Sequence, residues 1–314
     1  MLRLAAGLVT VGTVGALGIG AASAQAAGAR RPAANIDKAS WTKQAALSQA
    51  KTGNGPALAV FDGKLYAAWA GLTTNGVFYK SFKAGKWTKQ ATVPKALTGA
   101  SPALAVFDGK LYAAWEGLNT NHVWYASFNG TKWTKQATVP LAQTGAGPAL
   151  AAFDGRLYAA WEGLNTNHVW YANFNGSGWT TQATVPSAQT ANGPGLAVFD
   201  GRLYAAWTGL STHELFYSDF NGSGWTPQAK DKQAKSTNGP ALAVFDGRLY
   251  AAWSGQTTDG VFYANYNGST WTKQATVPSG LTTNGPALAP FDGKLYAAWT
   301  GRSTTKIWYS AYSI

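Results

Sequence analysis

The sequence contains no cysteine, only three histidines and few charged residues. Without cysteine there is no disulfide framework, no thiolate metal site and no cysteine nucleophile. Charged residues make up 12% of the chain, about half the usual share, whereas 46% of it is hydrophobic, which is too apolar for a disordered chain. Glycine and tryptophan are abundant, and together they indicate short strands and tight turns rather than surface helices.

Long apolar runs are absent after the first 27 residues. Residues 1–27 combine one early charge, Arg3, with an apolar run and a small-residue end at Ala24 and Ala26, which predicts a secretory signal peptide. An uncleaved membrane anchor is the alternative, because the run approaches spanning length, but its glycines and its small-residue end favour cleavage. Residues 28–38 predict a flexible lead-in. We therefore expect an exported, extracellular protein that has no membrane contact after cleavage.

The dominant pattern is an internal repeat of 46 residues, and such repeats decide the fold class. Six repeats fill residues 39–314 without an insertion. The triplet Phe-Asp-Gly begins at Phe61, Phe107, Phe153, Phe199, Phe245 and Phe291. A Trp-Thr pair recurs at the same interval, at Trp41, Trp87, Trp133, Trp179, Trp225 and Trp271.

Each repeat predicts four short strands. In the third repeat, Asp154-Gly155 forms a two-residue hairpin turn, since Asp-Gly accepts positive φ at both positions, and Pro186 ends the last strand. The strands are expected at 149–153, 156–161, 169–174 and 179–185.

Four antiparallel strands in each of six repeats predict an all-β fold, a six-bladed β-propeller over residues 39–314. Blades stacked around an axis bury both faces, which explains why 157–161 reads apolar on both sides. The last repeat lacks its fourth strand, and residues 41–45 supply it from the N-terminus. An open β-solenoid is the alternative, and the split blade argues against it, because closure removes exposed edges.

Catalysis is not expected from the ionisable residues. Six of the 13 acidic residues are turn aspartates, and Glu116 and Glu162 occupy equivalent positions in neighbouring blades, so no pair flanks one glycosidic bond. The histidines His122, His168 and His213 lie beside no nucleophile motif and form no metal-ligand cluster. The arginines do not cluster as a sialidase would require. We expect no enzyme activity, no metal and no cofactor.

Binding is expected at the loops between the second and third strands, where amides and carboxylates stand beside tryptophan. These groups suit a neutral sugar, because amides and carboxylates bond hydroxyls and an aromatic face covers C–H surface. The alternative is that the aromatics pack between blades and the loops are merely solvated. The candidate ligand-binding residues are Trp115, Glu116, Asn119, Asn121, His122, Trp124, Trp161, Glu162, Asn165, Asn167, His168 and Trp170.

A basic residue follows each Phe-Asp-Gly triplet. A ring would place the six on one face, where they could form a collar for anionic polymers such as cell-wall polymers. The alternative, which is favoured, is that they serve solubility and protect strand ends. Nucleic acid is not an expected partner, because no recognition helix or module motif is present. The collar residues are Lys64, Lys110, Arg156, Arg202, Arg248 and Lys294.

A turn of the form Asn-Gly-x-x-Trp precedes the outer strand in several repeats, as in 128–133, 174–179, 220–225 and 266–271. With six blades, this resembles the fucose-specific lectin propellers of fungi and bacteria. The resemblance implies multivalent sugar binding in pockets between adjacent blades. That family clamps fucose with an Arg on the second strand and a Glu on the third, and 123–125 and 169–171 contain no Glu. Fucose specificity is therefore not carried over.

Two functions of different classes remain open. The first is a secreted, monomeric lectin with several weak, repeat-equivalent sites that bind glycans or polysaccharides by avidity. The second is a propeller platform for protein–protein interaction or enzyme inhibition, which would need an asymmetric apolar patch. The irregular fourth blade, with 229–235 and 211–214, would be its place.

Overall fold

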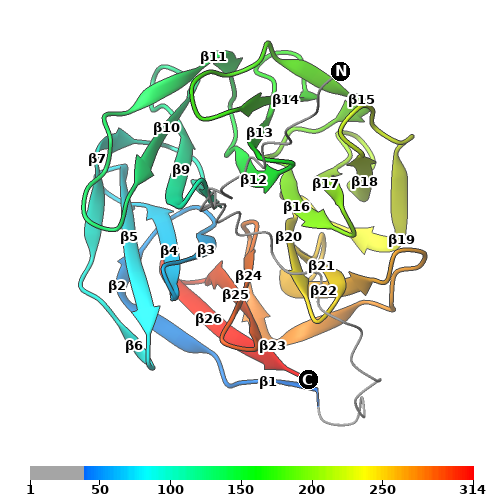
Figure 1. Cartoon of the computed structure of the whole chain (residues 1–314). Coiled ribbons are helices and arrows are strands. Elements are labelled where there is room, and N and C mark those ends of the chain that lie inside the picture. Colours follow the sequence, from blue (N-terminus) through cyan, green and yellow to red (C-terminus); the bar gives the residue numbers. More distant parts are fainter. Residues whose placement is uncertain (1–38) are drawn as a thin grey trace, which may run out of the picture.

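A computed structural model describes residues 39–314, and within them the chain forms strands, turns and loops without any helix. Six antiparallel sheets surround a central axis in sequence order (Figure 1). The predicted six-bladed β-propeller is confirmed. The predicted signal peptide and lead-in, residues 1–38, lie outside the described residues. Within the described part no helix has the length and hydropathy that a membrane crossing needs.

Each blade is a meander whose first strand lines the axis and whose last strand lies at the rim (Figure 1). Blade 1 contains β3 (Ala57–Phe61), β4 (Lys64–Ala70), β5 (Gly76–Lys83) and a rim strand in two parts, β6 (Lys86–Trp87) and β7 (Ala91–Leu97). Blade 2 contains β8 (Ala103–Phe107), β9 (Lys110–Glu116), β10 (His122–Phe128) and β11 (Ala137–Gln143). Blade 3 contains β12 (Ala149–Phe153), β13 (Arg156–Glu162), β14 (His168–Phe174) and β15 (Ala183–Gln189).

The remaining blades repeat this order. Blade 4 contains β16 (Gly195–Phe199), β17 (Arg202–Thr208), β18 (Glu214–Phe220) and β19 (Ala229–Lys235). Blade 5 contains β20 (Ala241–Phe245), β21 (Arg248–Ser254), β22 (Gly260–Tyr266) and β23 (Ala275–Leu281). Blade 6 contains β24 (Ala287–Phe291), β25 (Lys294–Thr300), β26 (Lys306–Ser313), β1 (Ser40–Trp41) and β2 (Ala45–Lys51).

The core lies between the blades. Leu157, Ala159 and Trp161 of β13 pack toward blade 2, whereas Tyr158 and Ala160 of the same strand pack toward blade 4. All five side chains are buried, so both faces of the strand are covered, as the apolar run predicts. The alanines keep the blades close, while the six equivalent tryptophans fill the wider space between them.

The N-terminal strands close the ring. β1 and β2 both pair antiparallel with β26, with Trp41 opposite Tyr312 and Ala45 opposite Tyr309. The inner strands of blades 6 and 1 are also neighbours, which excludes the open solenoid. Blade 1 is bonded to the closing strand through Lys80, which is buried and whose ammonium donates to the Ser48 carbonyl at 2.6 Å.

The rim strands differ from the prediction in their limits. Trp179 makes a single bridge to Phe174, and the paired strand β15 begins at Ala183 and continues past Pro186. Proline is tolerated because a rim strand needs no N–H on its outer side. Ser187, with φ of 59°, lies where the register with β14 shifts, so Pro186 sits in a bulge and does not end the strand.

The hairpin turns follow the predicted chemistry. Asp154 and Gly155 have φ of 47° and 66°, and the equivalent pairs in the other blades are alike. The Asn-Gly turns near the rim differ, because only the glycine has positive φ. There Asn175 Oδ1 accepts the N–H groups of Ser177 and Gly178, both at 2.9 Å, and so caps the turn.

Glycine is favoured just before the inner strands, because neighbouring backbones nearly touch around the axis. A Cβ on Gly239 would lie 1.9 Å from the carbonyl oxygen of Gly193, and one on Gly193 would lie 2.1 Å from that of Gly147. The same contact recurs at Gly55 and Gly285. Five glycines and one serine, Ser101, therefore set how closely the blades approach the axis.

Gly239→Ala should destabilise the ring by about 1–3 kcal/mol, because the new methyl group meets fixed backbone. Chemical unfolding measures this change. Gly178→Ala is the matched control, since nothing lies within 4 Å of its Cβ position, and it should change stability by less than about 0.5 kcal/mol. Equal effects of the two substitutions would contradict the close backbone contact.

Alkaline pH should weaken the ring through six equivalent tyrosines. Burial raises the pKa of Tyr66, Tyr112, Tyr158, Tyr250 and Tyr296, and it raises that of Tyr204 to about 12. The unfolded chain releases these protons near the ordinary pKa of 10.0, whereas the folded ring retains them. Stability is therefore present below pH 10 and falls as pH rises toward 12.

Unfolding by denaturant at pH 8, 10 and 11 measures this loss. Lys80 acts in the opposite sense, because burial lowers its pKa, but it is one group against six. The double variant Tyr204→Phe/Tyr250→Phe should lose less stability between pH 8 and 11 than the natural chain. An identical pH profile in the two proteins would contradict the assignment to these tyrosines.

Candidate binding surface

Two families of connections form one face of the ring. The loops from the second to the third strand of each blade, here called the central hairpin loops, lie at the same end of the ring as the connections between blades. They are residues 71–75, 117–121, 163–167, 209–213, 255–259 and 301–305. In blade 2 the loop is closed by the Gly117 N–H bonding the His122 carbonyl and the Asn121 N–H bonding the Gly117 carbonyl. Asn119 and Asn121 both have left-handed φ, at 64° and 57°, which asparagine tolerates well. Asn165 and Asn167 repeat this geometry in blade 3.

The carboxylates of these loops are buried and hold the backbone. Glu116 is 7% exposed, and its Oε2 accepts the Gly99 N–H at 3.2 Å and the Thr98 hydroxyl at 3.4 Å. Glu162 makes the same contacts with Gly145 and Thr144. Each glutamate thus secures the connection that enters its own blade. The structure gives these two predicted ligand-binding residues a positioning role.

The other connections are secured differently. Where the glutamate is replaced by serine or threonine, the connection carries an asparagine in place of the alanine found in blades 2 and 3. Asn238 donates to the Ser254 hydroxyl at 3.1 Å and to the Thr283 carbonyl of the next connection at 2.9 Å. The aligned repeats show that the glutamate and the asparagine replace each other. Only the structure shows the reason, which is that the asparagine bonds the next connection.

The tryptophans divide into two groups. Trp115 and Trp161 are each only 1% exposed, so they belong to the core and the prediction that they contact a ligand is wrong. Trp124 and Trp170 are half-buried and lie near the starts of β10 and β14, directly after the loop. The Trp124 indole N–H donates to the Thr120 hydroxyl at 3.3 Å, and the corresponding distance from Trp170 to Thr166 is 3.2 Å.

Glycine fixes the position of each indole. A Cβ on Gly117 would lie 2.4 Å from Trp124 Nε1, so the ring lies directly against the loop backbone. In blades 1, 4 and 5 a phenylalanine takes this place and stacks on the buried tryptophan, as Phe216 does on Trp207. Blades 2 and 3 therefore present a rigid, partly exposed indole beside polar loop groups.

Those polar groups have no partner within residues 39–314. Asn119 and Asn165 are exposed, and Asn121, His122, Asn167 and His168 are half-buried. None of these side chains makes a hydrogen bond to the described part of the chain, so the amide and imidazole groups are available to a ligand. Each loop combines them with the adjacent indole, and the arrangement is repeated once in the neighbouring blade.

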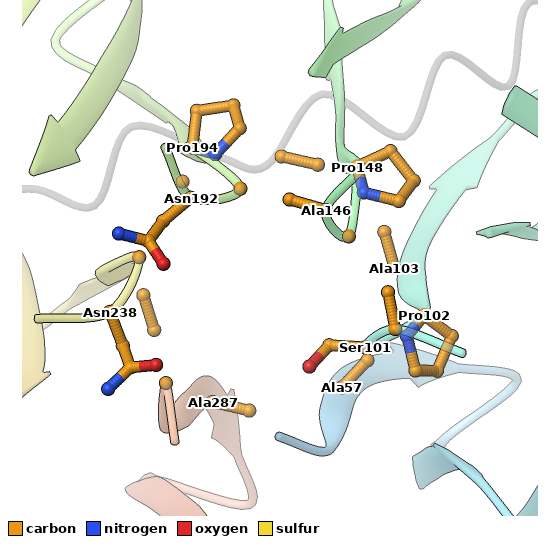
Figure 2. Close-up of a pocket in the computed structure, with 18 of the residues that line it drawn as sticks. Ala57, Ser101, Pro102, Ala103, Ala146, Pro148, Asn192, Pro194, Asn238 and Ala287 are labelled. Atoms are coloured by element: carbon orange, nitrogen blue, oxygen red, sulfur yellow. The ribbon is translucent and has the colours of Figure 1, made fainter. Parts of the chain in front are cut away.

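A hollow of about 360 Å³ opens where the axis meets this face. Figure 2 shows Asn192 and Asn238 on one side of it, with Ser101 and Ala146 across from them. Prolines, alanines, glycines and leucines from the starts of the inner strands complete the wall, and no ionisable side chain of residues 39–314 lines it.

The predicted basic collar lies on the opposite face and is largely engaged. Each collar residue follows a turn aspartate by two positions, so the ring of cations is matched by a ring of anions. Lys64 pairs with Asp62 at 3.0 Å, and Arg202 pairs with Asp219. Arg156 and Arg248 donate to asparagines of the same blade. No such bond is found for Lys110 or Lys294 within residues 39–314.

Blade 4 carries a buried acid rather than an apolar patch. Asp231 replaces the valine of other rim strands, is 3% exposed, and burial raises its pKa. Its neighbour Lys230 pairs with Glu214 at 2.9 Å. The interaction-platform hypothesis required an apolar surface here, whereas the residues present are the Lys230–Glu214 ion pair, the buried Asp231 and the exposed Lys232 and Lys235. Across residues 39–314 no three His, Cys, Asp or Glu side chains form a group suited to a metal ion.

No protein-family model matches the chain, and neither does any curated protein. Among solved structures, the SapL1 lectin in complex with alpha methyl fucoside has a TM-score of 0.62 at 14% identity, covering 80% of this chain and 89% of the lectin. A mutant of the Aleuria aurantia lectin in complex with Fucalpha1-6GlcNAc gives 0.61 at 13%, covering 82% and 93%. The Trypanosoma rangeli sialidase in complex with the inhibitor DANA gives 0.58 at 11%, covering 83% and 55%. At these identities the likeness concerns the fold, and it confirms the resemblance to the fucose-lectin propellers.

Proposed function

We propose that this protein is an exported, non-catalytic carbohydrate-binding protein that uses the central hairpin loops of blades 2 and 3. The observation that carries the proposal is the rigid indole of Trp124 beside the unpaired groups of Asn119, Asn121 and His122, repeated in blade 3. The leader-like residues 1–27 are the basis for proposing export.

The chemistry of these loops matches a sugar better than other small ligands. A pyranose presents hydroxyls at its edge and C–H groups on its face, so it needs hydrogen-bonding amides next to an aromatic plane. The loop supplies both and holds them before the ligand arrives, which lowers the entropy lost on binding. Its charge is also suitable, because the nearby carboxylates are occupied with backbone and leave a neutral surface.

Catalysis is the competing function, since a sialidase shares the fold. A glycosidase needs two carboxyl groups on either side of one bond. On this face Glu116 and Glu162 hold connections, while Glu214 and Asp259 pair with Lys230 and Arg302. Among residues 39–314 no ionisable side chain lines the axial hollow. These contacts support a binding function without hydrolysis.

Weak single sites would act together. The loops of blades 2 and 3 are identical in sequence from the glutamate to the histidine, whereas the other four loops differ from them and from one another. Two equivalent sites on one rigid ring raise the effective concentration of a polymer that reaches both. The proposed ligand is therefore a polysaccharide or a clustered glycan, with a weak affinity for the free monosaccharide.

The double variant Trp124→Ala/Trp170→Ala should lose retention on immobilised neutral polysaccharide by about tenfold or more, because each aromatic contact contributes about 0.5–1.5 kcal/mol. Affinity chromatography and a glycan array measure this loss. The matched control is Trp124→Phe/Trp170→Phe, which installs the residue found in blades 1, 4 and 5. The control should fold normally and retain most of the binding.

Circular dichroism and thermal unfolding establish that the alanine variant is still folded. Undiminished retention by a folded alanine variant would remove the assignment to these loops. Release of reducing sugar from any bound polysaccharide would instead favour a hydrolase. A natural chain that binds no glycan on the array would overturn the carbohydrate-binding proposal.

A further inference from the structure

Positive charge is distributed unevenly around the ring. Residues 98–281, which form blades 2 to 5 and their connections, hold ten basic and ten acidic side chains. Residues 39–97 and 282–314, which form blades 6 and 1, hold eleven basic side chains and only two acidic ones. The whole net charge of the described chain therefore belongs to two neighbouring blades.

Most of these cations lie on strands at or next to the rim. The closing strands β1 and β2 of blade 6 and the strands β6 and β7 of blade 1 contain no acidic residue at all. The two blades pack closely there, with Trp87 against Tyr309 at 5.6 Å between ring centres and Lys80 bonded to Ser48. The basic sector is the exposed set Lys43, Lys51, Lys83, Lys86, Lys89, Lys95 and Lys306.

Two lysine pairs in the sector face each other directly across strands. Lys83 is the register partner of Lys86, and Lys51 is the register partner of Lys306. Like charges in such positions destabilise a sheet. Blade 4 shows the stabilising alternative at the second of these positions, where Glu214 stands opposite Lys235.

The blade 1 turn carries a further local cost. In blades 2 to 5 an asparagine caps the turn between the third strand and the rim strand, as Asn129 does by accepting the N–H groups of Thr131 and Lys132. Lys83 replaces that asparagine, and Ala84 then adopts φ of 49°, a conformation that alanine rarely takes. Sequence choices that weaken the fold at one place are expected where a ligand binds.

We infer that the basic sector is a second binding surface, separate from the central hairpin loops, for a linear anionic polysaccharide. Lysines on flexible stems suit carboxylate, sulfate or phosphate groups spaced along such a polymer. Single-stranded nucleic acid fits less well, because its bases need exposed aromatic platforms. Within residues 39–314 no aromatic is among the large exposed hydrophobic side chains, and Trp87 packs on Phe82 and Tyr309.

The test compares two triple variants with the same loss of charge. The sector variant Lys83→Asn/Lys86→Thr/Lys95→Ser uses residues found at the equivalent positions of other blades, namely Asn129, Thr270 and Ser187. The control variant Lys132→Thr/Lys135→Thr/Lys273→Thr removes three exposed lysines from blades 2 and 5. Both should fold, which thermal unfolding verifies.

Binding is measured to immobilised polygalacturonic acid at increasing salt, with single-stranded DNA and a neutral polysaccharide as parallel probes. The natural chain should bind the polyanion and release it as salt rises. The sector variant should bind about tenfold more weakly, the control variant less than about twofold more weakly, and neither should change in retention on the neutral polysaccharide.

Three results would overturn the inference. The first is a natural chain that does not bind the polyanion at low salt, and the second is an equal loss in both variants, which would make net charge the cause. The third is tighter binding to single-stranded DNA than to the polysaccharide. Because Trp124→Ala/Trp170→Ala removes only the neutral sites, failure of this inference is distinguishable from failure of the proposed function.

Discussion

Every blade is apolar on both faces, and neither face is covered unless both neighbouring blades are in place. This requirement governs the rest of the molecule. A row of such blades would leave one bare face at each end, so the row must close. Closure is made by β1 and β2 pairing with β26, which joins the two ends of the described chain within one sheet. The stability of any single blade is therefore a property of the ring.

Ring closure also dictates what each repeat can vary. Positions that touch two blades, such as Trp161 and Ala160, are held nearly constant by packing. The position just before each inner strand is glycine or serine, because neighbouring backbones approach closely there. Freedom is left to the loops, the rim and the connections. The differences between blades are concentrated there, and they carry the information about function.

Two kinds of asymmetry result on an otherwise sixfold frame. Blades 2 and 3 share a loop that fixes an indole beside unpaired amides, while blades 6 and 1 share the net positive charge. The first feature depends on a buried glutamate that holds the neighbouring connection and on a glycine that lies against the indole. The second depends on the absence of acids from the rim. A single ring thereby holds these different surfaces at fixed separation.

The sequence by itself determined the number of blades, the hairpin turns and the closing strand, because a strict 46-residue period and Asp-Gly turns leave little choice of topology. It could not separate Trp115 from Trp124, since both are tryptophans on adjacent strands, and burial depends on the neighbouring blade. Nor could it show that Glu116 bonds the Gly99 N–H, because that contact joins a strand end to a connection 17 residues earlier. The prediction that Pro186 ends its strand was wrong for a similar reason. The strand lies at the rim, so the missing N–H of proline breaks no bond to an outer strand. Local periodicity fixes local structure, whereas exposure and partners are set by what the ring brings together.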